Sequence, residues 1–344
     1  MSKLLLNKHY RNAIEYICSR IKFCNSSILI TGASGLIGTI LVDSLILNNE
    51  IYNSNNEIIV LGRNRSLLME KFSENDIIFL EQDIKKEIEY QGKIDFIIHA
   101  ASNSSPDLYI SKPVDTIDIN FIGTTNVIKL ALEKRSKIIY TSTFEVYGKN
   151  DYDMISENDF GALDINNIRS CYTVSKALCE ILLKSYKQSY NLDFNIARLP
   201  SVYGPTMING DRKAHAQFLN NALKKENIIL KSEGIQKRTY LTAFDVADAL
   251  FYLITEGLSG ECYNISDLNC VSSIKDVAYI ISCISGVNVE FQVDRNNKNM
   301  YFRPYNSVLN PSKVNSLGWR AKYNLHDGLE LTYRILEGID KYAE

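Results

Sequence analysis

A tyrosine and a lysine four residues apart carry the clearest chemistry in this chain. Tyr172 and Lys176 lie in the run YTVSK, and at helical spacing they share one helix face. The ammonium of Lys176 favours the phenolate form of Tyr172, so this phenol can move a proton while a hydride moves to or from a nicotinamide ring. The pair alone is a weak signal, because the chain has 21 tyrosines and most such pairs are solvated helix faces.

Hydroxyl side chains precede this pair by one strand-to-helix crossover. The run TSTFEVYG, residues 141–148, leaves the end of an expected strand. Thr143 is expected to face the same pocket as Tyr172 and to hydrogen-bond a sugar hydroxyl or ketone, and Glu145 remains as a further base. The alternative is a polar turn that only caps the next helix.

A glycine-rich turn between a strand and a helix predicts a dinucleotide site. In TGASGLIG, Gly32 permits the tight turn, Gly35 lets the backbone approach a pyrophosphate, and Gly38 allows close packing of the helix on the sheet. The helix start adds unpaired N–H donors and the positive end of a dipole. The alternative, a turn that binds nothing, is disfavoured by the flanking strand and helix. The expected contacts here are Gly32, Ser34, Gly35, Leu36, Ile37 and Gly38.

The tip of the second expected strand bears on the choice between NADP and NAD. An Asp or Glu there would bind the ribose hydroxyls of NAD, whereas this chain has Arg63, Asn64 and Arg65. The two arginines are expected to neutralise a 2′-phosphate, so NADP is favoured over NAD; a solvated turn is the alternative. Further expected contacts at this edge are Asn64, Asp83 (to the adenine amine), Ile84, Ala100 and Ala101.

Alternating strands and helices must position these residues. β-Branched runs predict strands at 27–30, 57–61, 76–80, 94–98, 137–140 and 194–199, and helices at 38–47, 119–134 and 172–190. This alternation predicts an α/β fold, a doubly wound parallel Rossmann sheet covered on both faces. The Asn-rich patch at 48–56 is interpreted as a surface loop.

The chain is expected to have three parts. Residues 1–25 are interpreted as an amphipathic helical extension packed on the body through Ile14, Ile17, Cys18 and Ile21, with a membrane-surface role as the alternative. Residues 26–203 form the NAD(P)-binding domain, to which a later strand returns from about 235–266. Residues 204–344 form mainly a smaller substrate-binding lobe, because loops with Gly and Pro interrupt the alternation there.

Composition limits the partners. A formal net charge of −2 gives no general attraction for nucleic acid or anionic membrane. The seven cysteines lack CxxC spacing and an accompanying histidine cluster, so we expect no metal and no disulfide framework, but reduced thiols in a cytoplasmic protein. The apolar runs are too short to span a membrane.

These motifs together resemble the extended short-chain dehydrogenase/reductases, the NAD-dependent epimerase/dehydratase group that acts on nucleotide sugars. The resemblance covers about residues 26–335 and is strongest to UDP-glucuronate decarboxylases and dTDP-glucose 4,6-dehydratases. It rests on the glycine-rich turn, Asp83, His99-Ala100-Ala101, Asn120 before Gly123-Thr124, Thr143 with Glu145-Val146-Tyr147-Gly148, Tyr172 with Lys176, and Arg238-Thr239-Tyr240-Leu241.

The resemblance implies roles for individual residues. Thr143, Tyr172 and Lys176 would form a catalytic triad, and Asn120 would order the lysine through bound water. Arg238 would contact the diphosphate of a sugar nucleotide, and Ser201 replaces an asparagine of the group that does the same. Further substrate contacts are expected from Ser102, Thr143 and Arg303. The helices at 120–134 and 172–190 would form a homodimer interface, although core burial explains their apolar residues almost as well.

Two departures from the group narrow the reaction. Dehydratases place an Asp after the catalytic Thr and decarboxylases usually a Ser, whereas Phe144 stands here; dehydration is therefore disfavoured, decarboxylation weakened and epimerisation left open. Arg63 favours a cofactor that exchanges, as a net reductase needs. We therefore predict an NADP-linked 4-keto-sugar reductase acting at C4 of a nucleotide-diphosphate sugar, for deoxysugars of surface polysaccharides. A 4-epimerase and a UDP-glucuronate decarboxylase-like enzyme are the alternatives, and a non-catalytic cofactor-sensing protein is the alternative of another class.

Overall fold

The computed structural model describes residues 2–72, 76–103, 105–207, 211–293 and 306–340. Seven strands form one sheet in the order β10-β6-β5-β4-β1-β2-β3, and every neighbouring pair is parallel. The expected doubly wound Rossmann sheet is therefore confirmed. Its strands are β1 (Ser27–Thr31), β2 (Glu57–Gly62), β3 (Ile78–Glu81), β4 (Phe96–His99), β5 (Lys137–Thr143), β6 (Phe194–Leu199) and β10 (Cys262–Asn264).

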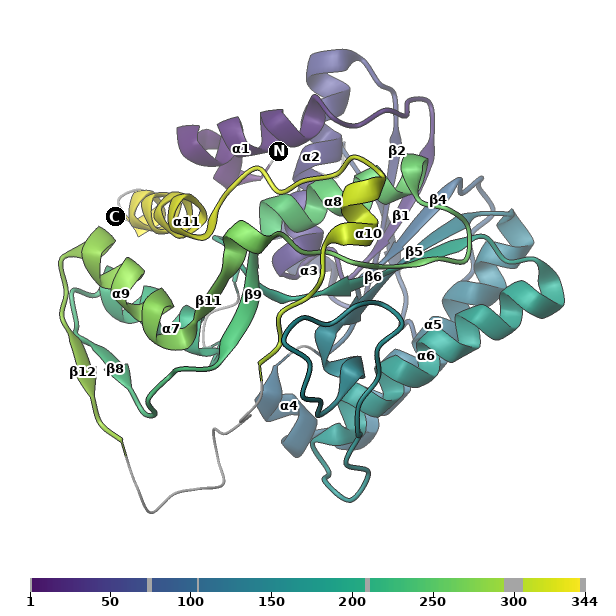
Figure 1. Cartoon of the computed structure of the whole chain (residues 1–344). Coiled ribbons are helices and arrows are strands. Elements are labelled where there is room, and N and C mark those ends of the chain that lie inside the picture. The colour runs from purple at the N-terminus through teal and green to yellow at the C-terminus, as the bar shows by residue number, and fades with distance from the viewer. Residues whose placement is uncertain (1, 73–75, 104, 208–210, 294–305, 341–344) are drawn as a thin grey trace.

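Helices cover both faces of this sheet (Figure 1). Successive strand residues point to opposite faces, so Ile28 and Ile30 join one apolar core and Leu29 joins the other. The first core packs under α1 (Lys8–Cys18), α2 (Leu36–Tyr52) and α8 (Ala243–Glu256), and the second under α5 (Pro113–Lys134) and α6 (Ser170–Tyr190). The buried strands therefore read as nearly continuous apolar runs. Two short helices, α3 (Arg65–Lys71) and α4 (Pro106–Ser111), lie at the ends of strands, and η1 (Lys3–Leu6) and η2 (Phe144–Tyr147) are 3-10 helices.

A smaller C-terminal lobe has its own apolar core. Its strands form two small sheets, β11-β9-β7 and β12-β8. The elements are β7 (Ser201–Tyr203), α7 (Ala214–Leu223), β8 (Ile228–Leu230), β9 (Lys237–Thr242), η3 (Leu268–Cys270), β11 (Val271–Ser273), α9 (Ile274–Ser285), β12 (Val289–Phe291) and α11 (Leu325–Asp340). The short helix α10 (Ser312–Ser316) instead contacts β10, and its Val314 joins the first core. In Figure 1 this lobe lies beside the end of the sheet.

The N-terminal helix packs on the body, as its apolar spacing predicts. Ile14, Ile17 and Cys18 are buried in the core above α2 and α8. The Tyr10 hydroxyl and the Ser2 hydroxyl both donate to Asp43 Oδ2 on α2, at 2.7 and 2.8 Å. Among the described helices, none is long and apolar enough to cross a membrane.

Several expected boundaries were wrong for local reasons. The interpretation of 48–56 as a loop was wrong in its first half, because α2 continues to Tyr52 and Asn48 is buried, donating to the Cys18 carbonyl at 3.1 Å. The α5 helix begins at Pro113 rather than 119, with proline in its first turn. Strands β3 and β4 begin two residues later than expected.

Candidate active site

The carboxyl ends of neighbouring strands bring the expected site residues to one edge. The strand order reverses between β1 and β4, and ligands of such sheets bind outside the carboxyl ends at this point. Thr31 at the end of β1 is in register with Leu61 on β2 and with His99 on β4. The turns after these strands, where the expected dinucleotide contacts lie, are therefore neighbours.

The glycine-rich turn has the backbone geometry that its spacing predicts. Gly32 has φ +73°, and a Cβ there would lie 2.8 Å from the carbonyl carbon of Ala100. A Cβ on Gly38 would overlap the Gly32 carbonyl oxygen, so only glycine permits this approach. Gly35 precedes α2, and no side chain caps this helix, which leaves N–H groups of Leu36, Ile37 and Gly38 for an anion. The turn therefore fits the diphosphate of a dinucleotide, with Ser34 at its tip.

A buried histidine network holds the turn after β4 against the turn after β1. His99 Nδ1 lies 2.8 Å from Thr31 Oγ1, and its Nε2 lies 3.1 Å from Thr124 Oγ1. Thr31 Oγ1 also accepts the N–H of Ala101 at 3.1 Å, next to Ala100. Burial lowers the pKa of His99 to about 3, so the ring is neutral. It links the two threonines by hydrogen bonds and thereby fixes the two turns.

The edge beyond β2 and β3 contains the residues expected around adenosine. The exposed Arg63 has Nη1 3.9 Å from Asp83 Oδ2, and Asp83 Oδ1 accepts the N–H of Lys85 at 3.0 Å. The Asn64 side chain accepts the N–H of Leu67 at 3.0 Å and caps α3, so its oxygen serves the fold first. Ile84 is buried against α5, where a Cβ on Gly123 would touch it.

The three expected catalytic side chains lie where β5 meets α6. Lys176 Nζ donates to the carbonyl of Thr141 at 2.8 Å, two residues before Thr143 on the same strand. Tyr172 lies one helical turn before Lys176 on α6, and Thr143 Oγ1 accepts the N–H of Glu145 at 3.2 Å. All three side chains are buried. Burial lowers the pKa of Lys176 to about 8.

Tyr172 is stacked on a tyrosine that the sequence did not single out. The rings of Tyr109 on α4 and Tyr172 have centroids 4.4 Å apart and planes within 9°. The thiol of Cys171 donates to the Tyr109 carbonyl at 3.4 Å, and the Arg169 guanidinium lies 5.9 Å from the centre of the Tyr109 ring. The α4 helix therefore covers one face of the Tyr172 ring.

Asn120 connects the turn after β4 to α6. Its Oδ1 accepts the Ser102 hydroxyl at 2.7 Å, and its Nδ2 donates to Ser175 Oγ at 2.9 Å. The Ser175 hydroxyl in turn donates to the Tyr172 carbonyl at 3.0 Å. Two predicted residues, Ser102 and Asn120, are thus joined to the backbone of the Tyr172 turn.

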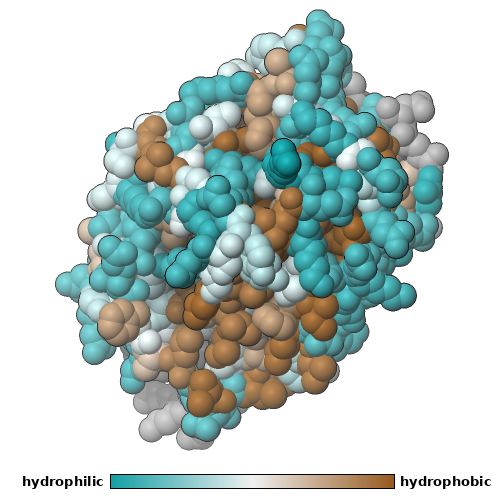
Figure 2. Space-filling model, turned by 90° about the vertical axis from the view of Figure 1, so that its right-hand side faces the viewer, coloured by the Kyte–Doolittle hydropathy of each residue, from teal (hydrophilic) through white to brown (hydrophobic). Residues whose placement is uncertain are grey.

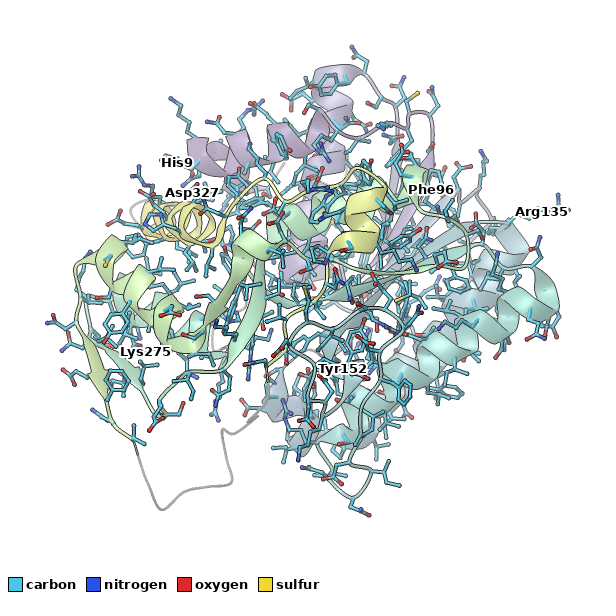
Figure 3. All side chains as sticks on the ribbon, viewed as in Figure 1. His9, Phe96, Arg135, Tyr152, Lys275 and Asp327 are labelled. Carbon is cyan, nitrogen blue, oxygen red and sulfur yellow. The ribbon has the colours of Figure 1, made fainter. Side chains whose placement is uncertain are left out.

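Of the two residues after Thr143, Phe144 packs against apolar side chains and Glu145 contacts polar and charged ones. Glu145 accepts the Thr173 hydroxyl at 3.2 Å and lies 3.9 Å from Arg169 Nη2. Phe144 packs with an apolar cluster of Tyr147, Ile155 and Leu309. Figure 3 labels Tyr152 in the connection between η2 and α6 that carries part of this cluster. The position after Thr143 is therefore apolar, and the nearby acid is engaged with α6.

Two of the expected substrate residues, Ser201 and Arg238, lie on strands of the lobe, whereas Ser102 and Thr143 lie at the edge of the main sheet. Ser201 on β7 is in register with Tyr240 on β9, and Arg238 lies two residues earlier on β9. The Thr206 hydroxyl donates to the Leu36 carbonyl at 2.6 Å and joins the lobe to the first turn of α2. Arg303 lies outside the described residues.

Two side chains near the expected site residues, Tyr109 and Lys71, were not identified from the sequence. Tyr109 meets Tyr172 only through tertiary packing, and nothing in its local sequence signals that contact. Lys71 donates to the Ser34 carbonyl. Its helix was signalled in the sequence, because Asn64 followed by RSLLMEK is the pattern of a capped helix.

Comparison with known proteins gives concordant matches. A model of the NAD dependent epimerase/dehydratase family matches residues 28–266. UDP-glucuronic acid decarboxylase 5 of Arabidopsis thaliana is 29% identical over 329 residues, which are 93% of each chain. The crystal structure of UDP-glucose 4-epimerase with UDP-glucose from Thermotoga maritima superposes with a TM-score of 0.78 at 24% identity, covering 92% of this chain and all of that one. UDP-glucose 4-epimerase of Thermus thermophilus, in complex with NAD, gives 0.74 at 23% identity, covering 91% and 99%. At these identities the structures establish the fold alone.

Proposed function

The chain belongs to the NAD-dependent epimerase/dehydratase family, and from that premise we propose that it reduces the 4-keto group of a nucleotide-diphosphate sugar with NADPH. The observation that carries this proposal is the meeting of β5 and α6, where Lys176 Nζ donates to the Thr141 carbonyl beside Thr143 and one turn from Tyr172. In this proposal Tyr172 and Thr143 act on one sugar oxygen, and Lys176 acts through Tyr172.

Each residue has one task in this reaction. The glycine-rich turn and the start of α2 would hold the diphosphate of the cofactor, and its nicotinamide would supply the hydride for C4 of the sugar. Thr143 donates a hydrogen bond to the C4 oxygen, and Tyr172 delivers the proton that converts the ketone to a hydroxyl. Lys176 keeps a positive charge beside Tyr172, which stabilises the phenolate that remains.

The nucleotide part of the substrate is assigned to the C-terminal lobe. Arg238 binds the diphosphate through its planar guanidinium, a geometry suited to phosphate oxygens. Ser201 donates a further hydrogen bond, and Ser102 accepts one from the sugar because its own proton is donated to Asn120. Arg303 remains a proposed contact. The hydrogen bond from Thr206 to Leu36 supports this assignment, because it joins the lobe to the helix that starts at the diphosphate-binding turn.

The residues after Thr143 disfavour dehydration and weaken decarboxylation. Phe144 lies in an apolar cluster and offers no proton, and Glu145 is engaged with Thr173 and Arg169. Loss of a C6 hydroxyl needs an acid at the sugar. The exposed Arg63 at the end of β2 favours a cofactor with a 2′-phosphate that enters and leaves as a co-substrate. Decarboxylation and 4-epimerisation remain the alternatives, because the relatives include enzymes named for both.

A homodimer is part of the proposal. Leu178 and Ile181 on α6 are exposed, as are Ile117 and Ile122 on α5, and Figure 2 shows apolar side chains gathered on the face that α5 and α6 form. Other apolar residues of α5, namely Val127, Leu130 and Ala131, are buried in the protein's own core, as the alternative explanation of these helices expected.

The test is a panel of nucleotide-diphosphate sugars, including 4-keto sugars, incubated with NADPH or NADH. Consumption of NADPH with a product two hydrogens heavier supports the reductase. A product of unchanged mass identifies an epimerase, and loss of CO2 a decarboxylase. Tyr172→Phe is the control: it should bind cofactor as the wild type does and lower turnover by ~10²-fold or more. Binding of the cofactor without turnover of any sugar would favour the remaining alternative, a non-catalytic protein that senses the cofactor.

A further inference from the structure

A lysine from the helix after β2 lies against the glycine-rich turn after β1. Lys71 is the last residue of α3, and its Nζ donates to the Ser34 carbonyl at 2.9 Å and to Thr39 Oγ1 at 3.2 Å. Ser34 is in the turn, and Thr39 is in the first two turns of α2. The ammonium is therefore held beside the segment that meets the dinucleotide.

This ammonium is half-buried and has only neutral acceptors. Within the described ranges, no carboxylate lies within ion-pairing distance of Lys71; Asp43, whose charge favours the protonated amine, accepts hydrogen bonds from Tyr10 and Ser2 instead. Burial lowers the pKa of Lys71 against this attraction. Withdrawing a charge from water without an ion pair destabilises the fold, and a neutral amide would satisfy the same two acceptors. Among the described residues the ammonium therefore has two neutral acceptors and the longer-range attraction of Asp43, but no ion pair.

A second cation lies on the same edge. Arg63 follows β2, is 61% exposed, and has Asp83 as its charge partner at 3.9 Å. Because β1 and β2 are adjacent and in register at Thr31 and Leu61, the turn that holds Ser34 adjoins the strand end that holds Arg63. One cation therefore lies at each of two adjacent turns, on the edge where the ribose of a dinucleotide would leave the diphosphate.

From this geometry we propose that Lys71 is a specificity-determining residue that binds, together with Arg63, the 2′-phosphate monoester of NADP. The inference rests on the use of NADP in the proposed function and deepens it by naming the second cation. The ammonium supplies a point charge with three donors, and the guanidinium supplies a planar fork. The diphosphate, which NAD and NADP share, is bound at the start of α2, so the contribution of Lys71 is confined to the phosphate that NAD lacks.

The test compares binding of NADP+ with NAD+, and of 2′,5′-ADP with 5′-ADP, by isothermal titration calorimetry without a sugar. Lys71→Gln should weaken NADP+ and 2′,5′-ADP by ~10-fold or more, the scale of one charge-assisted hydrogen bond, and change NAD+ and 5′-ADP by less than about twofold. Lys71→Arg, which keeps the charge, should retain the preference for NADP+. The matched control is Lys224→Gln, an exposed lysine of the C-terminal lobe, which should behave as the wild type.

Two results would overturn the inference. Equal weakening of all four ligands in Lys71→Gln would show that Lys71 only supports the turn. Tighter binding of NAD+ than NADP+ by the wild type would remove the 2′-phosphate site altogether. Because the assay contains no sugar, either result is separate from failure of the proposed reductase chemistry, which is judged from products. Thermal melts of each variant verify that it is folded.

Discussion

The charge on Lys176 sets an upper pH limit for catalysis. Burial lowers the pKa of this ammonium from the ordinary lysine value of 10.5 to about 8. The side chain is therefore charged below about pH 8 and loses its charge as the pH rises through that value. Once neutral, it no longer stabilises the phenolate of Tyr172.

We accordingly expect kcat/KM to fall as the pH rises above about 8. Lys176→Arg keeps its charge at every accessible pH, so whatever activity this variant retains should lack that alkaline limb. The measurement is the pH–rate profile of both proteins with saturating cofactor. An identical limb in wild type and Lys176→Arg would assign the titration to another group.

The stack between Tyr109 and Tyr172 gives a second expectation. Tyr109→Leu removes the ring that covers Tyr172, frees the phenol to change orientation and should lower kcat by ~10-fold to 10²-fold, the scale of a misplaced catalytic group. Tyr109→Phe keeps the ring and should retain most of kcat. The comparison needs steady-state kcat and KM of the three proteins. If Tyr109→Leu turned over like the wild type, the stack would have no role in positioning.

The sequence reveals residues whose role is local and misses those whose role depends on tertiary contact. The glycine spacing predicted the turn because Gly32 and Gly38 have backbone requirements that only glycine meets. The pairing of Tyr172 with Lys176 followed from helix periodicity. Tyr109 and Lys71 reach the site from short helices at strand ends, and single-sequence periodicity cannot place those helices against the turn or against α6.

At the level of elements, the N-terminal helix stabilises the helix that begins at the dinucleotide turn. Asp43 on α2 is buried, accepts hydrogen bonds from Tyr10 and Ser2, and has its pKa raised by burial to about 6. It is thus ionised at neutral pH and needs its donors, because a buried carboxylate without them is costly. The apolar spacing predicted α1, but not this polar contact.

Tyr10→Phe tests this contact. The change removes one donor to the carboxylate and should lower the free energy of unfolding by about 1–3 kcal/mol, measured by urea denaturation at pH 7.5. Tyr52→Phe, at an exposed tyrosine near the end of α2, is the matched control and should have no measurable effect. Equal midpoints for all three proteins would show that Tyr10 contributes packing alone.

The ends of α2 and the start of α5 differ from the expected bounds because local sequence preferences there favour more than one structure. The α2 helix continues past its expected end because the side chain of Asn49 makes two hydrogen bonds with the backbone of Asn56, which follows the helix. Its Nδ2 donates to the Asn56 carbonyl and its Oδ1 accepts the Asn56 N–H, at 2.8 Å each. An asparagine-rich patch is ambiguous in sequence, since asparagine favours turns but can also make such side-chain bonds. The α5 helix begins at Pro113 because proline favours the first turn of a helix, where its missing N–H costs no hydrogen bond.

For the whole molecule, the exposed apolar face of α5 and α6 predicts self-association. Ile181→Glu places a charge on the proposed interface (Figure 2) and should convert a dimer to a monomer in size-exclusion chromatography with light scattering. Ile235→Glu, at an equally exposed isoleucine of the C-terminal lobe, should remain dimeric. A monomeric wild type, at micromolar concentration, would contradict the expectation.

The strands of the large sheet were predictable and those of the lobe were not, for one reason. The main strands are apolar runs linked by helices, so their alternation specifies a parallel sheet. The lobe's β7, β8, β11 and β12 have three residues each and pair with partners distant in sequence, which leaves too little periodic signal to assign them. The position of Arg238 relative to Ser201 therefore emerged only from the fold.

The central claim, net transfer of hydride from NADPH to C4 of a sugar with Tyr172 as proton donor, is tested most directly by isotope transfer. NADPH carrying deuterium at the transferable C4 position is incubated with a 4-keto nucleotide-diphosphate sugar, and the product is analysed by mass spectrometry and NMR. Our account predicts one deuterium at C4 of the product from the wild type, with stoichiometric NADP+ formation, and a rate lower by ~10²-fold in Tyr172→Phe. A product without deuterium, formed with no consumption of NADPH, would contradict it.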